Sequence, residues 1–237
     1  MRGAAATEGD GSGREGAAVQ LGRSRRMVLV VELLVLFVAV PLALVPLRQR
    51  FAPLMMPVLL AIAIGCLVVL LRDPQFDRTR LWHVEGLRKG LGRTLVLWVL
   101  GGAALVVATW LWRPDLFLRL PRESPALWLA ILALYPLLSV YPQEIIFRTF
   151  LFERYRAVIP DPRHRVAASA LSFALAHLFF ANWIAPVLSL LGGLLFATSY
   201  ARRRSTLLVC VEHGLWGDLL FTVGLGWYFY GGSIAST

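Results

Sequence analysis

Long apolar stretches separated by short polar connectors run along almost the whole chain, and this pattern predicts a bundle of membrane-spanning helices. Seven stretches have about the length needed to cross a hydrocarbon core of ~30 Å, although the fifth is short. They cover residues 27–47, 51–71, 94–112, 126–150, 166–180, 183–200 and 206–223. We therefore expect an all-α, polytopic transmembrane helical bundle of about seven spans.

The segments outside these stretches predict little further structure. Residues 1–22 are rich in Gly, Ala and polar side chains, so we expect a disordered N-terminal tail before a single transmembrane domain at 23–237. The connector at 72–93 is interpreted as a loop with room for a short interfacial helix. After Gly224 the sequence continues as LGWYFY, which fits either a helix end with interfacial aromatics or an incomplete eighth element.

Composition and charge favour a membrane protein and argue against nucleic acid as a partner. Apolar residues make up 58% of the chain, more than a water-soluble protein of 237 residues can bury. The net charge of +10 comes from basic residues between the apolar runs, not from a basic groove with interleaved aromatics. With the N-terminus in the cytoplasm, 19 of the 24 Lys and Arg residues lie on the cytoplasmic side. This asymmetry predicts that topology.

Three of the predicted spans each carry one ionisable residue at a similar depth. Glu144, His177 and His213 lie 10, 12 and 9 residues from the arginine that marks the predicted cytoplasmic end of their helix. At helical rise these separations are about 15, 18 and 14 Å. Arg148 follows Glu144 by four residues, so the two side chains share one helix face. We expect the three helices to bring these groups together.

Each residue also has a purely structural explanation. Glu144 and Arg148 can form an ion pair that only holds the helix in place, and His177 can pack between helices while bonded to a neighbouring carbonyl group. Glu32, at the start of the first span, can extend its carboxylate to the interface. The common depth of Glu144, His177 and His213 favours a functional site, because ionisable groups inside a membrane are costly and usually functional.

A carboxylate and two imidazoles can activate a water molecule in two ways. Glu144 can take a proton from the water as a general base. Alternatively, Glu144, His177 and His213 can ligate a divalent metal such as zinc as a two-histidine, one-carboxylate set. Both routes fit peptide-bond hydrolysis. The chain contains neither an HExxH pattern nor a serine in a GxSxG turn.

Three short motifs resemble those of the CAAX prenyl protease and bacteriocin-processing (CPBP) family. The family writes them EExxxR, FxxxH and HxxxN or HxxxD. In this chain they stand as QEIIFR at 143–148, FALAH at 173–177, and His213 in the last long span. The resemblance covers about residues 125–222, which we take as the CPBP-like core, and the first three spans contribute little to it.

That resemblance implies an intramembrane endopeptidase that cleaves a membrane-associated protein or peptide. By position, Glu144 and Arg148 match the first motif, Phe173 and His177 the second, and His213 the third. In such enzymes the motif glutamates and the first histidine activate water, and the last histidine with its partner stabilises the oxyanion. Members differ in whether they need a metal. We expect membrane lipid and a peptide or protein substrate as partners, in the cytoplasmic (inner) membrane of a bacterium. The depth of the site predicts that the substrate approaches from the cytoplasmic side or laterally from the lipid.

The chain departs from the family pattern at two positions. Gln143 stands where the family has its first glutamate, and an amide cannot take a proton at neutral pH. Gly217 stands four residues after His213 in place of Asn or Asp, and Asp218 follows it. On an ideal helix Asp218 lies about 140° around from His213, so it reaches the same site only if the helix loosens.

Three functions fit these observations. The first is a CPBP-type intramembrane protease in which Glu144 is the base and Gln143 orients water or substrate. The second is a catalytically inactive homologue that acts as a membrane binding or immunity protein. The third is a proton-coupled carrier, although the chain lacks the internal repeats and broken helices typical of carriers.

Overall fold

The computed structural model describes residues 22–229, and within this range every regular element is a helix and no strand occurs. Among the described residues, six helices are long and apolar enough to cross a membrane. They are Arg23–Leu44, Arg48–Arg72, Val84–Trp112, Pro125–Arg154, Ile184–Arg203 and Thr206–Val223. The predicted all-α membrane bundle is confirmed, whereas the side on which the chain begins stays a prediction. The predicted tail lies, apart from Gly22, outside the described residues.

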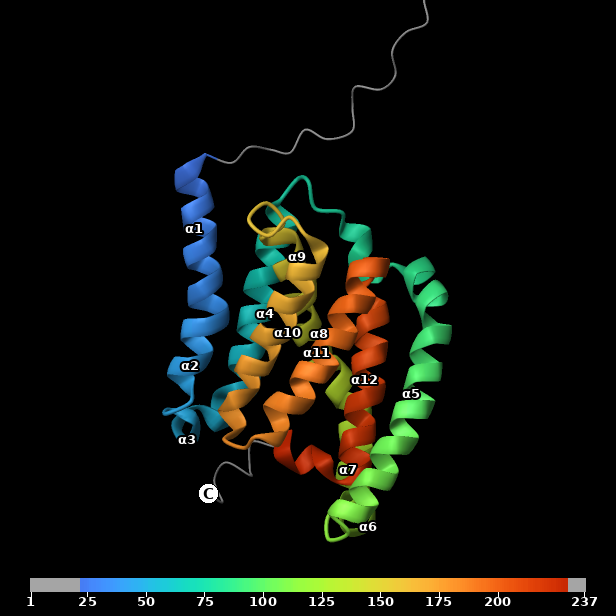
Figure 1. Cartoon of the computed structure of the whole chain (residues 1–237). Coiled ribbons are helices and arrows are strands. Elements are labelled where there is room, and N and C mark those ends of the chain that lie inside the picture. Colours follow the sequence, from blue (N-terminus) through green and yellow to red (C-terminus); the bar gives the residue numbers. More distant parts are fainter. Residues whose placement is uncertain (1–21, 230–237) are drawn as a thin grey trace, which may run out of the picture.

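The fifth predicted span corresponds to a shorter helix. α10 runs over Pro162–His177, and a 3₁₀ turn, Leu178–Phe180, continues it. Its 16 residues rise about 24 Å, less than the ~30 Å of a hydrocarbon core. Figure 1 shows α10 beside α11 (Ile184–Arg203) and extending between the same two ends of the bundle. The count of seven spans rests on this helix and stays a prediction.

The connector predicted at 72–93 is largely helical, which corrects our interpretation. α4 (Met55–Arg72) is followed by a 3₁₀ turn, Arg78–Trp82, and α5 (Val84–Trp112) begins ten residues earlier than the apolar pattern indicates. The extra turns of α5 pack against the start of α12, so tertiary contacts extend a helix through polar sequence. After α12, the segment LGWYFY begins with a 3₁₀ turn, Leu225–Phe229.

The C-terminal helices form the centre of the bundle and the N-terminal helices its periphery. About half of the apolar window is buried in α11 and in α12 (Thr206–Val223), against 11–17% in the first three long helices. In Figure 1, α1 (Arg23–Leu34) with α2 (Val40–Leu44) and α5 stand at opposite edges, with α11 and α12 between them. α10 and α11 approach closely because Gly193 faces Ala170, where an added Cβ would lie 3.0 Å from a backbone atom.

Two π-helical turns interrupt the long helix that carries the first motif. The helix comprises α7 (Pro125–Tyr135), a π turn (Pro136–Val140), α8 (Tyr141–Glu144), a second π turn (Ile145–Phe150) and α9 (Leu151–Arg154). Pro136 and Pro142 have no backbone N–H to donate, so the regular hydrogen-bond ladder cannot continue through them. Such turns are common at functional sites, and here they flank Glu144.

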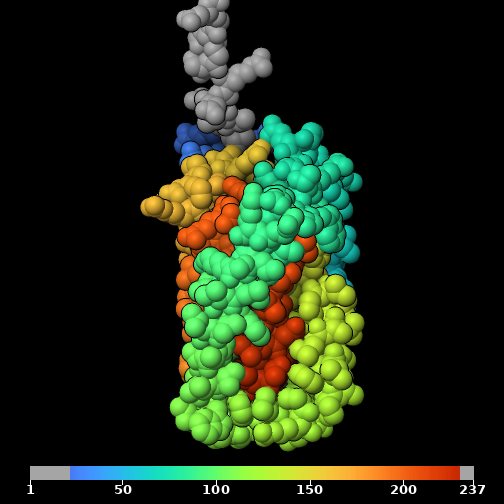
Figure 2. Space-filling model, turned by 90° about the vertical axis from the view of Figure 1, so that its right-hand side faces the viewer, coloured from blue at the N-terminus to red at the C-terminus, as the bar shows by residue number. Residues whose placement is uncertain are grey.

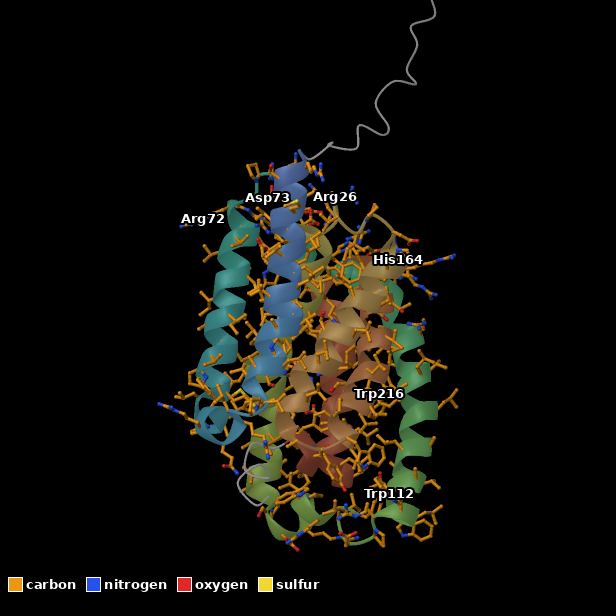
Figure 3. The ribbon with its side chains drawn as sticks, turned by 60° about the vertical axis from the view of Figure 1, so that its left-hand side comes forward. Arg26, Arg72, Asp73, Trp112, His164 and Trp216 are labelled. Carbon is orange, nitrogen blue, oxygen red and sulfur yellow. The ribbon has the colours of Figure 1, made fainter. Side chains whose placement is uncertain are left out.

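The two ends of the bundle differ in chemistry. Figure 3 places Arg26, Arg72 and His164 at one end and Trp112 at the other. At the arginine-rich end, Glu32 accepts hydrogen bonds from Arg154 and from the Tyr155 hydroxyl. Our expectation that Glu32 merely extends to the interface is therefore wrong, because it joins α1 to α9. This partition agrees with the positive-inside pattern without identifying which end is cytoplasmic.

Candidate functional site

The buried ion pair of the first motif extends to a histidine on another helix. Arg148 Nη1 lies 3.2 Å from Glu144 Oε1, and His213 Nδ1 lies 2.7 Å from the same oxygen. Glu144 and Arg148 have no exposed surface, and His213 is 6% exposed. Since a carboxylate only accepts hydrogen bonds, the imidazole donates through Nδ1–H. Of the expected meeting of Glu144, His177 and His213, the contact between Glu144 and His213 is observed, with Arg148 beside Glu144.

A tyrosine that the sequence analysis did not single out completes this chain of polar groups. Tyr135, the last residue of α7, places its hydroxyl 3.1 Å from His213 Nε2. Both nitrogens of the His213 ring are thus engaged, one by Glu144 and one by Tyr135. A tyrosine in an aliphatic helix gives no signal of such a role.

Aromatic rings surround the charged centre. The Arg148 guanidinium lies 4.3 Å from the centroid of the Phe173 ring and 5.4 Å from that of Phe196. The Phe196 ring also stacks on His213, with centroids 4.8 Å apart and an interplanar angle of 19°. These rings exclude water, which strengthens the electrostatic interactions among Arg148, Glu144 and His213.

His177, the other histidine of the predicted site, packs against the same Phe173 ring. Its Nδ1 donates to the backbone carbonyl of Phe173 at 2.7 Å, which leaves Nε2 as the available ring nitrogen. The Phe173 ring centroid is 4.5 Å from that of His177 and 5.5 Å from that of His213. Phe173, predicted from the second motif, therefore packs against both histidines, which line the same cavity.

A cavity of about 450 Å³ opens beside these groups between α5, α11 and α12. Its wall is mainly apolar, with polar groups contributed by Tyr135, His177, Ser189 and His213. The Ser189 hydroxyl and the Trp216 indole N–H are buried there without a hydrogen-bond partner in the described range. Glu144 is not part of the wall, so a molecule in the cavity meets the imidazoles first. Figure 3 shows Trp216 between Trp112 and the arginine-rich end.

The cavity lies in the half of the bundle away from the start of α1. Its lining comes mainly from the C-terminal halves of α5, α10 and α12 and from the N-terminal half of α11. In Figure 2 the C-terminal part of α12 is visible between α5 and α7 on the lateral surface. With a cytoplasmic N-terminus, this placement does not favour the predicted approach of substrate from the cytoplasmic side. It does leave a lateral route from the lipid.

Gln143 is not among the residues that line the cavity. Its amide Nε2 donates to the Ser139 hydroxyl at 2.7 Å, and its Oε1 is buried with no partner among residues 22–229. Glu144, the next residue, points to His213 instead. The side chain at position 143 is thus built into helix packing, and it is not placed to touch a molecule in the cavity.

The helix α12 remains regular through the third motif, so Asp218 does not reach His213. Thr206 to Val223 form one continuous α-helix, and neither Gly214 nor Gly217 interrupts it. The Asp218 Oδ1 is buried with no hydrogen-bond partner in the described part of the chain. Gly217 instead faces the Tyr135 ring, where an added Cβ would lie 2.3 Å from Cε1.

The residues proposed as metal ligands do not form a metal-binding set. Glu144 Oε1 and His213 Nδ1 are hydrogen-bonded to each other at 2.7 Å, which leaves no room for an ion between these two atoms, and His177 Nδ1 is bonded to the Phe173 carbonyl. Within residues 22–229, no group of three or more His, Cys, Asp or Glu side chains is arranged to hold a metal ion. Glu144, His177 and His213 therefore do not fit the two-histidine, one-carboxylate zinc site.

Comparison with known families agrees with the motifs. Residues 124–217 match the family described as type II CAAX prenyl endopeptidase Rce1-like. This segment contains Tyr135, Glu144, Arg148, His177 and His213, and the resemblance to the CPBP family is confirmed over it. The match relates the chain to membrane proteases, consistent with a hydrolase embedded in lipid. Comparisons with curated proteins and with solved structures gave no match.

Proposed function

We propose that this chain, Rce1-like over residues 124–217, is an intramembrane endopeptidase that hydrolyses a peptide bond of a membrane-associated substrate. The observation that carries the proposal is the continuous polar chain from Arg148 through Glu144 and His213 to the cavity. A buried carboxylate that fixes an imidazole beside a cavity is an arrangement suited to acid and base chemistry.

In the proposed reaction His177 takes a proton from the attacking water. Its Nδ1–H is committed to the Phe173 carbonyl, so Nε2 is free to accept. The water oxygen bonds to the scissile carbonyl carbon as the proton moves to His177. The peptide C–N bond then breaks, and His177 returns the proton to the leaving amine.

His213 and Glu144 act on the opposite side of the scissile bond. Negative charge develops on the carbonyl oxygen, and the positive charge of a protonated His213 ring stabilises it, since Glu144 and Tyr135 engage both ring nitrogens. Glu144 is hydrogen-bonded to the ring and compensates a proton on the imidazole, while Arg148 lies 3.2 Å from the same carboxylate oxygen. Glu144 thus acts through His213, in contrast to the direct base expected from its place in the motif.

The cavity supports a substrate that is mostly apolar with a few polar groups. The unpartnered Ser189 hydroxyl and Trp216 N–H supply hydrogen-bond donors that a peptide backbone can use. Approach from the lipid between α5 and α7 fits a membrane-anchored chain. Whether that chain is prenylated, as the family description implies, is decided by including prenylcysteine peptides in the assay below.

The test is hydrolysis of a peptide panel, with and without C-terminal prenylcysteine, by the protein in liposomes. We expect cleavage by the wild type, and its loss in Glu144→Ala and in His177→Ala. Matched controls are Glu32→Ala at the arginine-rich end and His164→Ala on the exposed surface, which should both cleave. Cleavage that persists in both site variants would overturn the residue assignment.

Gln143 favours a second candidate, a catalytically inactive homologue that binds a membrane partner. In that case no peptide of the panel is cleaved, while binding of a membrane protein is retained and is abolished by mutation of the cavity. A carrier predicts proton or solute flux across the same liposomes, which a pH-sensitive dye inside them reports.

A further inference from the structure

Gly217 and Tyr135 are fitted to one another across two helices. Gly217 lies on α12 one turn after His213, and the Tyr135 ring from α7 occupies the space beside its Cα. A Cβ at position 217 would come within 2.3 Å of Tyr135 Cε1 and 2.6 Å of its hydroxyl oxygen, closer than real Cβ contacts. Any side chain at 217 therefore displaces the tyrosine.

The space that Gly217 leaves open is used for a hydrogen bond. Residues four apart on a helix share a face, so a side chain at 217 would point toward His213. Here the Tyr135 hydroxyl takes that place and lies 3.1 Å from His213 Nε2. The edge of the tyrosine ring also packs against Phe221, with ring centroids 5.2 Å apart, which fixes its orientation.

We propose that Tyr135 is a positioning residue that supplies His213, from a neighbouring helix, with the partner that position 217 lacks. A tyrosine hydroxyl can donate to Nε2 when the imidazole is neutral and accept from Nε2–H when it is protonated. Tyr135 therefore holds the ring in one orientation at both stages of the proposed reaction. The inference rests on the proposed function and goes beyond the motif residues.

The first test removes only the hydroxyl. Tyr135→Phe keeps the ring against Gly217, so we expect kcat to fall about 10- to 100-fold with KM unchanged, as for groups that orient a catalytic residue. The matched control is Tyr155→Phe, which removes another buried tyrosine hydroxyl, one bonded to Glu32 3.0 Å away. That control should keep the wild-type kcat. Equal kcat in Tyr135→Phe and wild type would overturn the inference and leave the proposed function intact.

The second test moves the polar partner of His213 from position 135 on α7 to position 217 on α12. Gly217→Asn alone should unfold more readily and lose activity, because the introduced amide side chain and the Tyr135 ring cannot both fit. In the Tyr135→Ala variant the tyrosine ring is absent, so an asparagine side chain fits at position 217. We therefore expect the double variant Tyr135→Ala, Gly217→Asn to have a kcat at least threefold higher than that of Tyr135→Ala alone. If Gly217→Asn is equally harmful with and without Tyr135, the fit between the two positions is contradicted.

A spectroscopic measurement separates this inference from the proposed function. With ¹⁵N-labelled histidine, the Nε2 signal of His213 should shift in Tyr135→Phe and stay unchanged in Tyr155→Phe. The chain has four histidines, so the signal can be assigned by substitution. A wild type that cleaves nothing but shows this shift contradicts the protease and supports the hydrogen bond. An unchanged Nε2 signal contradicts the role of Tyr135 whether or not cleavage occurs.

Discussion

Two carboxylate–arginine pairs involve the helix Pro125–Arg154. Glu144 and Arg148 pair within the helix, and Arg154 at its end pairs with Glu32 of α1. At the end, Glu32 accepts two hydrogen bonds from Arg154, at 2.9 and 2.8 Å, and one from Tyr155 at 3.0 Å. In the middle, Arg148 approaches Glu144 at 3.2 Å, yet none of its three side-chain nitrogens forms a hydrogen bond with the described residues.

The difference separates a structural pair from a functional one. The Glu32 and Arg154 side chains are 24% and 35% exposed, bidentate and satisfied, which is what an interhelical link requires. Glu144 and Arg148 are fully buried, and Glu144 shares its one bonded oxygen with His213. Burying charges with incomplete hydrogen bonding is costly, so such a pair is weak support for stability. It is better explained by the chemistry beside it.

The largest effect is expected when the inner pair, Glu144 and Arg148, is broken. Arg148→Met leaves Glu144 as an uncompensated buried carboxylate, and we expect a loss of about 3–5 kcal/mol in the free energy of unfolding. Arg154→Met, at the partly exposed pair, should cost about 1 kcal/mol or less. Chemical denaturation of both variants in detergent micelles checks the contrast. Equal losses would remove the distinction between the two pairs.

Replacing both inner partners sharpens the contrast. Glu144→Leu with Arg148→Met removes both buried charges, so stability should return to within about 1 kcal/mol of the wild type. Hydrolysis should remain absent because His213 has lost its carboxylate. The same double replacement at Glu32 and Arg154 should leave hydrolysis unchanged. The comparison uses unfolding in micelles and cleavage in liposomes on the same preparations.

Replacing an aromatic ring that packs on a buried arginine should have an intermediate effect on kcat and stability, and Phe173 and Phe152 provide the comparison. Phe173→Leu removes the ring that contacts Arg148 and both histidines, and we expect about a tenfold loss of kcat with about 1–2 kcal/mol lost in stability. Phe152 is equally buried and lies near Arg165 and Arg204. Phe152→Leu should lose similar stability without losing activity. A similar kcat for the two variants would show that Phe173 only packs.

The smallest effect is expected at Gln143. Its amide donates to Ser139 and does not line the cavity, so Gln143→Glu should change kcat less than threefold. Any larger loss would come from the second carboxylate beside Glu144. A tenfold gain would instead show that the site lacks a glutamate at this position.

Helix periodicity and depth were enough to predict most of the centre from the sequence. Glu144 and His213 meet as expected, because rigid helices that cross the same membrane bring residues of equal depth together, and Arg148 lies beside Glu144 as its i+4 spacing predicts. Two features could not be predicted this way. One is the setting of His177: depth says nothing of the hydrogen bond from its Nδ1 to the Phe173 carbonyl or of its contact with the Phe173 ring.

Long-range partners were the other failure of sequence reasoning. Glu32 pairs with Arg154 across 122 residues, and no local pattern signals such a contact. Tyr135 has no motif of its own, and the signal that could have found it was Gly217. A motif position that loses its side chain leaves space, and another residue must fill that space in a well-packed interior. The helical start of α5 was not predicted for the same reason, because its polar sequence is helical where it packs against the start of α12.

Cleavage by the folded Glu144→Leu, Arg148→Met double variant tests the central claim most directly. In liposomes carrying a peptide that the wild type hydrolyses, we expect the double variant to be as stable as the wild type and to show no cleavage. Cleavage at the wild-type rate by this stable variant would contradict the claim that Glu144 serves hydrolysis through His213.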